Sequence, residues 1–99
     1  MPDFQWDAGN ESHIMNDYPI RANTTDEVES LFSDPAFAPL PDRVDDQGEQ
    51  RYKVVARSNL NRILYVAFVV RNGQIRPISC RPANRKERER YAQNTQKSE

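Results

Sequence analysis

Arginine dominates the residues of this chain that suit chemistry on an anionic group. Eleven of the fourteen basic residues are arginine, and the planar guanidinium can hold two oxygens of one phosphate at once. Arg51, Lys53 and Arg57 alternate with other residues, so a strand would carry all three cations on one face. Arg81 ends a second strand-like segment further along the chain. The pattern predicts a surface that meets a phosphate-bearing partner.

The basic residues are concentrated in one half of the chain. Residues 1–50 hold twelve Asp and Glu against two Arg, whereas residues 51–99 hold twelve Lys and Arg against three Glu. The formal net charge of −1 is therefore the sum of two opposite biases. Such a distribution favours a local partner surface. An equally weighted alternative is that the acidic half folds back and pairs with the basic half.

Two helices are expected in the acidic half. Asp7 can cap a helix over residues 8–16, and Thr24 with Glu27 has the spacing of a capping box. The second helix should end near Ser33. Three prolines follow, and the acidic stretch at residues 42–49 is typical of a solvated loop.

The sheet is expected in the basic half. Alternation predicts a strand from Arg51 to Arg57, and the apolar run at residues 63–70 predicts a central strand covered on both faces. The dipeptide Asn72-Gly73 is a strong hairpin signal leading into a strand over residues 75–81. Pro77 lacks a ladder donor, which predicts an edge position or a bulge there.

The predicted fold class is α+β, with an antiparallel sheet of about four strands, two N-terminal helices and one C-terminal helix. Asn84 and Glu87 predict that the last helix starts there and ends near residue 92. Residues 1–92 should form a single domain, followed by a disordered tail at residues 93–99.

Composition indicates the compartment. Cys80 is the only cysteine, so neither an internal disulfide nor a cysteine cluster for zinc is expected, and the cysteine itself should be buried. The chain lacks an apolar run of about 18 residues and a secretory signal pattern. These features predict a cytoplasmic protein without a membrane partner.

Three groups of residues resemble one family, the BrnT-like toxins of bacterial type II toxin–antitoxin modules. The first group consists of Phe4, Trp6 and Asp7. The second resembles the family's Gly-Glu-x-Arg and Gly-Arg-Ser motifs, with Ala56 replacing the second glycine, and consists of Gly48, Glu49, Arg51, Arg57 and Ser58. The third is the most specific and consists of Ile75, Arg76, Ile78, Ser79 and Arg81, followed by Ala83, Glu87 and Tyr91.

The resemblance implies a small α+β protein similar to the RelE-like ribonuclease toxins. Such a protein would cut RNA without a metal or other cofactor and arrest growth. A cognate antitoxin, BrnA-like and of the ribbon-helix-helix type, would neutralise it, and a higher-order toxin–antitoxin complex is a further expectation.

The chain departs from the family where many members have Lys-His-Gly after the first helix. Asp17, Tyr18 and Pro19 occupy that place, and His13 is the only histidine. This departure favours an alternative function, a non-catalytic module of the same scaffold that binds protein or RNA.

Metal-independent RNA cleavage needs a base, cations that stabilise the phosphate in the transition state, and an acid for the leaving oxygen. Arg57 and Arg81, at the ends of two strands of one sheet, are the candidates for the cationic role. Arg51, Lys53 and Arg88 would extend the RNA-binding surface. The alternative is that these cations are solvated or pair with the acidic half.

The candidates for proton transfer are Tyr91, His13 and Glu49. Tyr91 shares a helical face with Glu87 and Arg88, so its ring would stack a base or its hydroxyl would pass a proton. The alternative for Tyr91 is to anchor a polar helix on the sheet. His13 would otherwise lie on a helix surface or contact the antitoxin, and Glu49 would otherwise be an inert loop residue.

Overall fold

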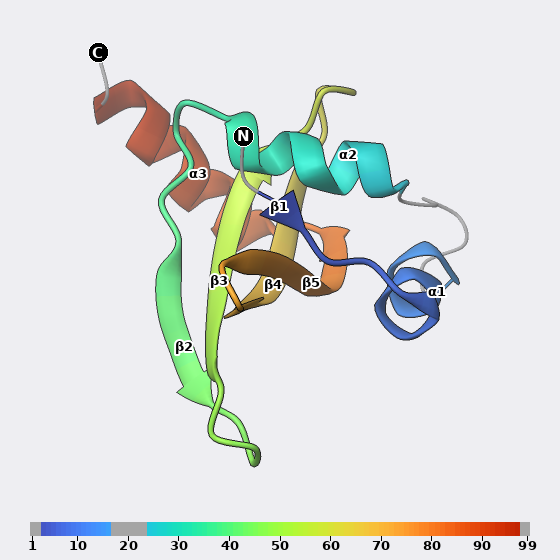
Figure 1. Cartoon of the computed structure of the whole chain (residues 1–99). Coiled ribbons are helices and arrows are strands. Elements are labelled where there is room, and N and C mark those ends of the chain that lie inside the picture. The colour runs from blue at the N-terminus through green and yellow to red at the C-terminus, as the bar shows by residue number, and fades with distance from the viewer. Residues whose placement is uncertain (1–2, 17–23, 98–99) are drawn as a thin grey trace.

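A five-stranded sheet organises the molecule (Figure 1). The computed structural model describes residues 3–16 and 24–97, except for the side chains of residues 13–16, 96 and 97. In chain order its elements are β1 (Asp3–Phe4), α1 (Ala8–Asn16), α2 (Thr25–Ser30), the short 3-10 helix η2 (Leu31–Ser33), β2 (Leu40–Val44), β3 (Gln50–Arg57), β4 (Ile63–Arg71), β5 (Gln74–Pro82) and α3 (Arg85–Lys97).

The sheet has the strand order β1-β5-β4-β3-β2. β1 is parallel to β5, and the other three pairings are antiparallel. The α+β class is confirmed, but the predicted antiparallel sheet of about four strands is corrected to a mixed sheet of five.

Side-chain alternation in β3 separates the two faces of the sheet as predicted. Val54 and Ala56 are buried on one face, whereas Arg57 is exposed on the other. The register places Val54 opposite Val66 and Ala56 opposite Leu64, so the apolar side chains of β4 continue the same buried face.

The β4–β5 hairpin forms where the sequence predicts it. Asn72 and Gly73 have φ angles of 52° and 77°, as a type I′ turn requires at both central positions. Further along, the register shifts opposite Pro77 and Ser79. The bulge predicted from Pro77 is therefore confirmed, because the missing donor falls where the ladder is already interrupted.

The helix starts follow the predicted capping residues. The Asp7 carboxylate accepts hydrogen bonds from the backbone N–H groups of Gly9 and Asn10, at 2.9 and 3.2 Å. The Thr24 hydroxyl accepts one from the Glu27 N–H at 3.1 Å. The Glu27 carboxylate does not complete the box, because it is buried against Arg62 and Ser58.

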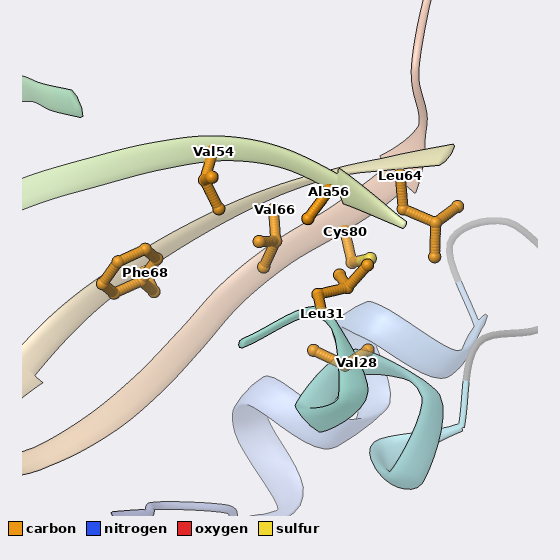
Figure 2. Packing of buried hydrophobic residues seen from close by; sticks show 8 residues of the cluster. All are labelled: Val28, Leu31, Val54, Ala56, Leu64, Val66, Phe68 and Cys80. Atoms are coloured by element: carbon orange, nitrogen blue, oxygen red, sulfur yellow. The ribbon is translucent and has the colours of Figure 1, made fainter. Parts of the chain in front are cut away.

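The hydrophobic core lies between α2, η2 and one face of β3, β4 and β5, as Figure 2 shows. Val28 and Leu31 point from the helical segment toward the sheet, where Val66 and Cys80 are among the residues that meet them. Cys80 is 1% exposed, as predicted. Burial raises the pKa of its thiol to about 12. The thiol therefore stays protonated at neutral pH and is a poor nucleophile.

The structure differs from the predicted elements in three places. Part of the stretch taken for a solvated loop pairs with β3 as the edge strand β2, whose five residues are all exposed. An edge strand tolerates Pro41 and charged side chains, so its sequence looks like a loop. The parallel strand β1 was also not predicted, and α3 extends past residue 92 to Lys97. None of the helices in the described part is long and apolar enough to cross a membrane.

Candidate functional site

The candidate site lies on the sheet face opposite the core. We call it the α3 face and define it by Lys53 and Arg57 of β3, Tyr65 of β4, Arg81 of β5 and the helix α3, which covers part of it. Arg57 is opposite Ile63 of β4, and Arg81 is opposite Tyr65. The two arginines therefore flank β4 on one face, with their strands about 10 Å apart across the sheet.

Neutral groups hold the Arg57 side chain. Its Nη1 donates a hydrogen bond to Asn61 Oδ1 at 2.6 Å, and its guanidinium carbon lies 5.8 Å from the centroid of the Tyr91 ring. Asn61 adopts a left-handed φ of 64° in the turn between β3 and β4, which aims its amide back toward the strand. Arg57 is exposed and forms no ion pair with any residue that the structure describes.

Asp34 joins the end of β3 to α3. Its carboxylate accepts hydrogen bonds from the backbone N–H of Arg57 at 2.7 Å and from the Tyr91 hydroxyl at 2.6 Å. Partial burial would raise the pKa of Asp34, but these bonds and one from the Ala36 N–H outweigh it, so the pKa lies below its ordinary value.

Tyr91 belongs to α3 and is only 7% exposed. Burial, followed by the hydrogen bond to Asp34, raises the pKa of its hydroxyl. The phenol therefore keeps its proton at neutral pH, which suits an acid or an anchor and not a base. Its buried position favours the anchoring role that the sequence left open.

Glu87 holds Arg81 and also caps α3. The two guanidinium nitrogens Nη1 and Nη2 donate to the two carboxylate oxygens at 2.8 and 3.0 Å. Glu87 Oε1 also accepts from the Asn84 N–H, while Asn84 Oδ1 accepts from the Glu87 N–H, so the two residues form a capping box at the predicted helix start. The Arg81 guanidinium stacks 4.1 Å from the centroid of the Tyr65 ring. Hydrogen bonds from Arg81 lower the pKa of Glu87.

The other predicted RNA-binding residues have internal partners. Arg51 pairs with Asp45 at 3.4 Å and Lys53 with Asp42 at 3.8 Å. Arg88 Nη1 donates to the Ala83 carbonyl at 2.8 Å.

Ion pairs between the two halves of the chain account for part of the charge split. Besides those of Arg51 and Lys53, they join Arg62 to Glu27, Arg71 to Glu49 and Arg76 to Asp7. The folding back of the acidic half is therefore real for these five cations. It leaves out the Arg57 guanidinium, which donates a hydrogen bond to the neutral Asn61, while the backbone N–H of Arg57 donates to the Asp34 carboxylate.

Glu49 is not close to Arg57. Arg57 lies eight positions after Glu49 along β3, or about 26 Å of extended chain. Two arginine nitrogens of Arg71 donate to Glu49 at 2.6 and 2.7 Å, and these bonds lower its pKa. A carboxylate held in this way is a poor base.

The histidine position is only partly described. His13 belongs to α1, which packs against β5, but its side chain lies outside the described residues. Asp17, Tyr18 and Pro19, which replace the family's Lys-His-Gly, also lie outside them.

Sequence reasoning missed Asp34, Asn61 and Tyr65. Asp34 lies 23 residues before Arg57 and 57 before Tyr91, and no local pattern links such distant positions. Tyr65 was within reach, because a correct register between β4 and β5 places it beside Arg81. Within the described part of the chain, no group of three or more His, Cys, Asp or Glu is arranged to hold a metal ion.

Most of the chain matches a known protein family. Residues 6–87 match the model of the family described as the ribonuclease toxin BrnT of type II toxin–antitoxin systems. The match spans β2 to β5, Arg57, Arg81 and the start of α3. A search of curated proteins found no match.

Proposed function

Since the chain belongs to the BrnT ribonuclease toxins of type II toxin–antitoxin systems, we propose that it cleaves RNA on the α3 face without a metal ion and thereby arrests growth. In this reaction the 2′-oxygen attacks the phosphorus as a base takes its proton. The bond to the 5′-oxygen breaks as an acid protonates that oxygen, which leaves a 2′,3′-cyclic phosphate.

Arg57 is the principal phosphate-binding group in this proposal. The observation that carries it is an exposed guanidinium whose side-chain contacts in the described structure are the neutral Asn61 and Tyr91. Its charge is permanent, and its guanidinium forms no ion pair with the described residues, although the nearby Asp34 carboxylate attracts it at longer range. The guanidinium is therefore available to the negative charge that develops on the phosphate.

Arg81 is the second phosphate-binding group. It shares the α3 face with Arg57, but a phosphate must compete with Glu87 for it. The ring of Tyr65 packs against the planar Arg81 guanidinium and restricts its orientation, which favours two-oxygen contact with a phosphate.

The test compares three variants of the purified, antitoxin-free protein on an RNA oligonucleotide in EDTA. Arg57→Ala should lower the cleavage rate by about 100-fold or more, as expected when one transition-state donor is removed. Arg57→Lys should recover only part of the rate. Arg85→Ala, on α3 with a side chain that is 86% exposed, is the matched control and should cleave normally.

Cleavage at the wild-type rate by Arg57→Ala would refute the site. If the wild type does not cleave RNA in EDTA but does so once Mg²⁺ is added, metal independence is refuted. Arg81→Ala should also lower the rate, but it removes a partner of Glu87 and therefore needs a parallel unfolding curve.

The proton carriers of the proposed reaction are His13 as the base and Tyr91 as the acid. An unperturbed histidine has a pKa of about 6.5, which suits a base near neutral pH. If His13 serves in this role, the wild-type rate should fall below that pH, and His13→Ala should be slow at every pH. A normal rate in His13→Ala would exclude it.

The cognate antitoxin is proposed to be a ribbon-helix-helix protein that covers the α3 face, in a complex with more than one copy of each chain. The complex should then be unable to cleave RNA, and Arg57→Ala should weaken its assembly. Simultaneous binding of antitoxin and RNA to the α3 face would contradict this arrangement.

The alternative function is RNA or protein binding without catalysis. It is favoured by the engagement of Glu49 with Arg71 and of the Tyr91 hydroxyl with Asp34, and by the absence of the family's Lys-His-Gly. In the same assay a binding module would retard RNA in a gel, dependent on Arg57, and leave it intact.

A further inference from the structure

A pocket opens on the α3 face beside the proposed phosphate-binding residues. It lies between α3, the segment leading into β2, and the sheet, and its apolar lining is formed by Ala36, Ala38, Leu40 and Val55. Leu40 remains 52% exposed at this place. An apolar lining that is open to solvent suits a flat ring that enters and leaves.

The same pocket adjoins the phosphate-binding arginines. Tyr65, Glu87 and Tyr91 line it. Tyr65 and Glu87 also contact Arg81, and Tyr91 contacts Arg57. A ligand with a ring and a phosphate can therefore occupy the pocket and the arginines together, which is the chemistry of a nucleotide.

Two further cations line the pocket and are available to a ligand. The side chain of Arg90 forms no hydrogen bond or ion pair with the residues that the structure describes. Lys53 contacts Asp42 at 3.8 Å, with both side chains well exposed, and such a pair is weak and easily exchanged. Lys53 and Arg90 therefore supply N–H donors and no acceptors.

We propose that this pocket binds the base of the nucleotide next to the cleaved phosphate and that Lys53 and Arg90 favour guanine or uracil over adenine. The proposal rests on the proposed RNA cleavage for its biological meaning, but not for its geometry. Guanine offers O6 and N7 as acceptors and uracil offers carbonyl oxygens, whereas the amino group of adenine would face the two cations.

Binding is tested by NMR titration of the full chain with GMP, UMP, AMP and ribose 5-phosphate, following the amides of Ala36, Ala38 and Val55. GMP and UMP should shift these signals and bind about tenfold more tightly than AMP. Ribose 5-phosphate carries the phosphate without a base, so it should leave these signals unchanged.

Two matched substitutions locate the base. Ala38→Phe fills the pocket and should weaken GMP binding about tenfold or more. Ala8→Phe places the same ring on an exposed residue of α1, outside the pocket, and should bind GMP normally. Lys53→Gln together with Arg90→Gln should remove the preference for GMP over AMP.

Equal binding of GMP, AMP and ribose 5-phosphate, or unchanged GMP binding in Ala38→Phe, would overturn the pocket proposal even if the wild type cleaves RNA. Conversely, GMP binding at the pocket in a protein that leaves RNA intact would support the pocket and overturn the proposed ribonuclease. In an active protein, Ala38→Phe should change which RNA positions are cut, and an unchanged cleavage pattern would count against the pocket.

Discussion

Arg57 and Arg81 share a face but differ in what holds them. Arg57 is positioned by an amide and an aromatic ring, whereas Arg81 is bound by both oxygens of Glu87. A carboxylate in contact with a cation offsets much of its attraction for phosphate, and an amide does not. The two residues, which look equivalent in the sequence, should therefore contribute unequally to phosphate binding.

Replacement of Tyr91 separates its anchoring role from a role as acid. Tyr91→Phe keeps the ring but removes the hydrogen bond to the Asp34 carboxylate. We expect a loss of about 1–2 kcal/mol in the free energy of unfolding, measured with urea. Tyr52→Phe is the control, because the Tyr52 hydroxyl has no hydrogen-bond partner in the described structure. If Tyr91 only anchors α3, the folded variant cleaves RNA at the normal rate, and a slow folded variant would identify it as the acid.

At the scale of elements, α1 is attached to the sheet by one buried side chain. Asn10 is 5% exposed. Its amide donates to the carbonyls of Gln5 and Pro77, both at 3.0 Å, and its oxygen accepts from the Asp7 N–H at 2.8 Å. One asparagine therefore connects the chain after β1, the start of α1 and the bulge in β5.

Removal of this side chain should loosen α1 as a unit. Asn10→Ala leaves the buried Pro77 carbonyl, the partly buried Gln5 carbonyl and the Asp7 N–H without their partner, so we expect a loss of about 2 kcal/mol or more in the free energy of unfolding. Amide hydrogen exchange should rise in α1 before it rises in β3 and β4. Asn59→Ala, in the exposed turn after β3, should change neither quantity. Uniformly raised exchange in Asn10→Ala would contradict a local role.

The elements that sequence predicted are those with local signals. The alternation of β3, the apolar run of β4, the Asn72-Gly73 turn and the capping residues act over a few positions, and all appear in the structure. β1 has two residues and is defined only by its parallel pairing with β5. Its formation depends on contacts some 70 positions away, which no local pattern encodes.

The candidate site follows the same division. The shared face of Arg51, Lys53 and Arg57 follows from the period of a strand. The contacts that distinguish these cations do not, because Asp42 and Asp45 meet Lys53 and Arg51 only once β2 pairs with β3, and Asp34 comes from a segment 23 positions before Arg57. Sequence therefore identified the cations and left open which of them remain available to a ligand.

At the scale of the whole molecule, the acidic half is attached to the basic half by ion pairs. The most buried of the acidic partners is Glu27, which is 1% exposed. Its carboxylate pairs with Arg62 and also accepts a hydrogen bond from the Ser58 hydroxyl. Burial would raise the pKa of Glu27, but the hydrogen bonds from Arg62 and Ser58 outweigh it and lower the pKa. Arg76 lowers the pKa of Asp7 to about 2. Asp34, Asp45, Glu49 and Glu87 also have lowered pKa values.

These lowered pKa values predict an acid-sensitive fold. The unfolded chain binds protons at the ordinary carboxylate pKa values of about 4, and the folded chain binds them only at lower pH. The stabilisation is therefore complete above about pH 5 and is lost as the pH falls through the folded pKa values, down to about 2 for Asp7.

Thermal melts between pH 7 and pH 2 should show a steep fall in Tm below pH 5. Glu27→Gln should be less stable at pH 7, because it leaves Arg62 without its buried charge partner, but it should lose less further stability on acidification than the wild type. Glu89→Gln, on the exposed side of α3, should follow the wild-type curve. A Tm that stays level from pH 7 to pH 2 would mean that the two halves are held together by apolar packing alone and that their opposite charges contribute little to the fold.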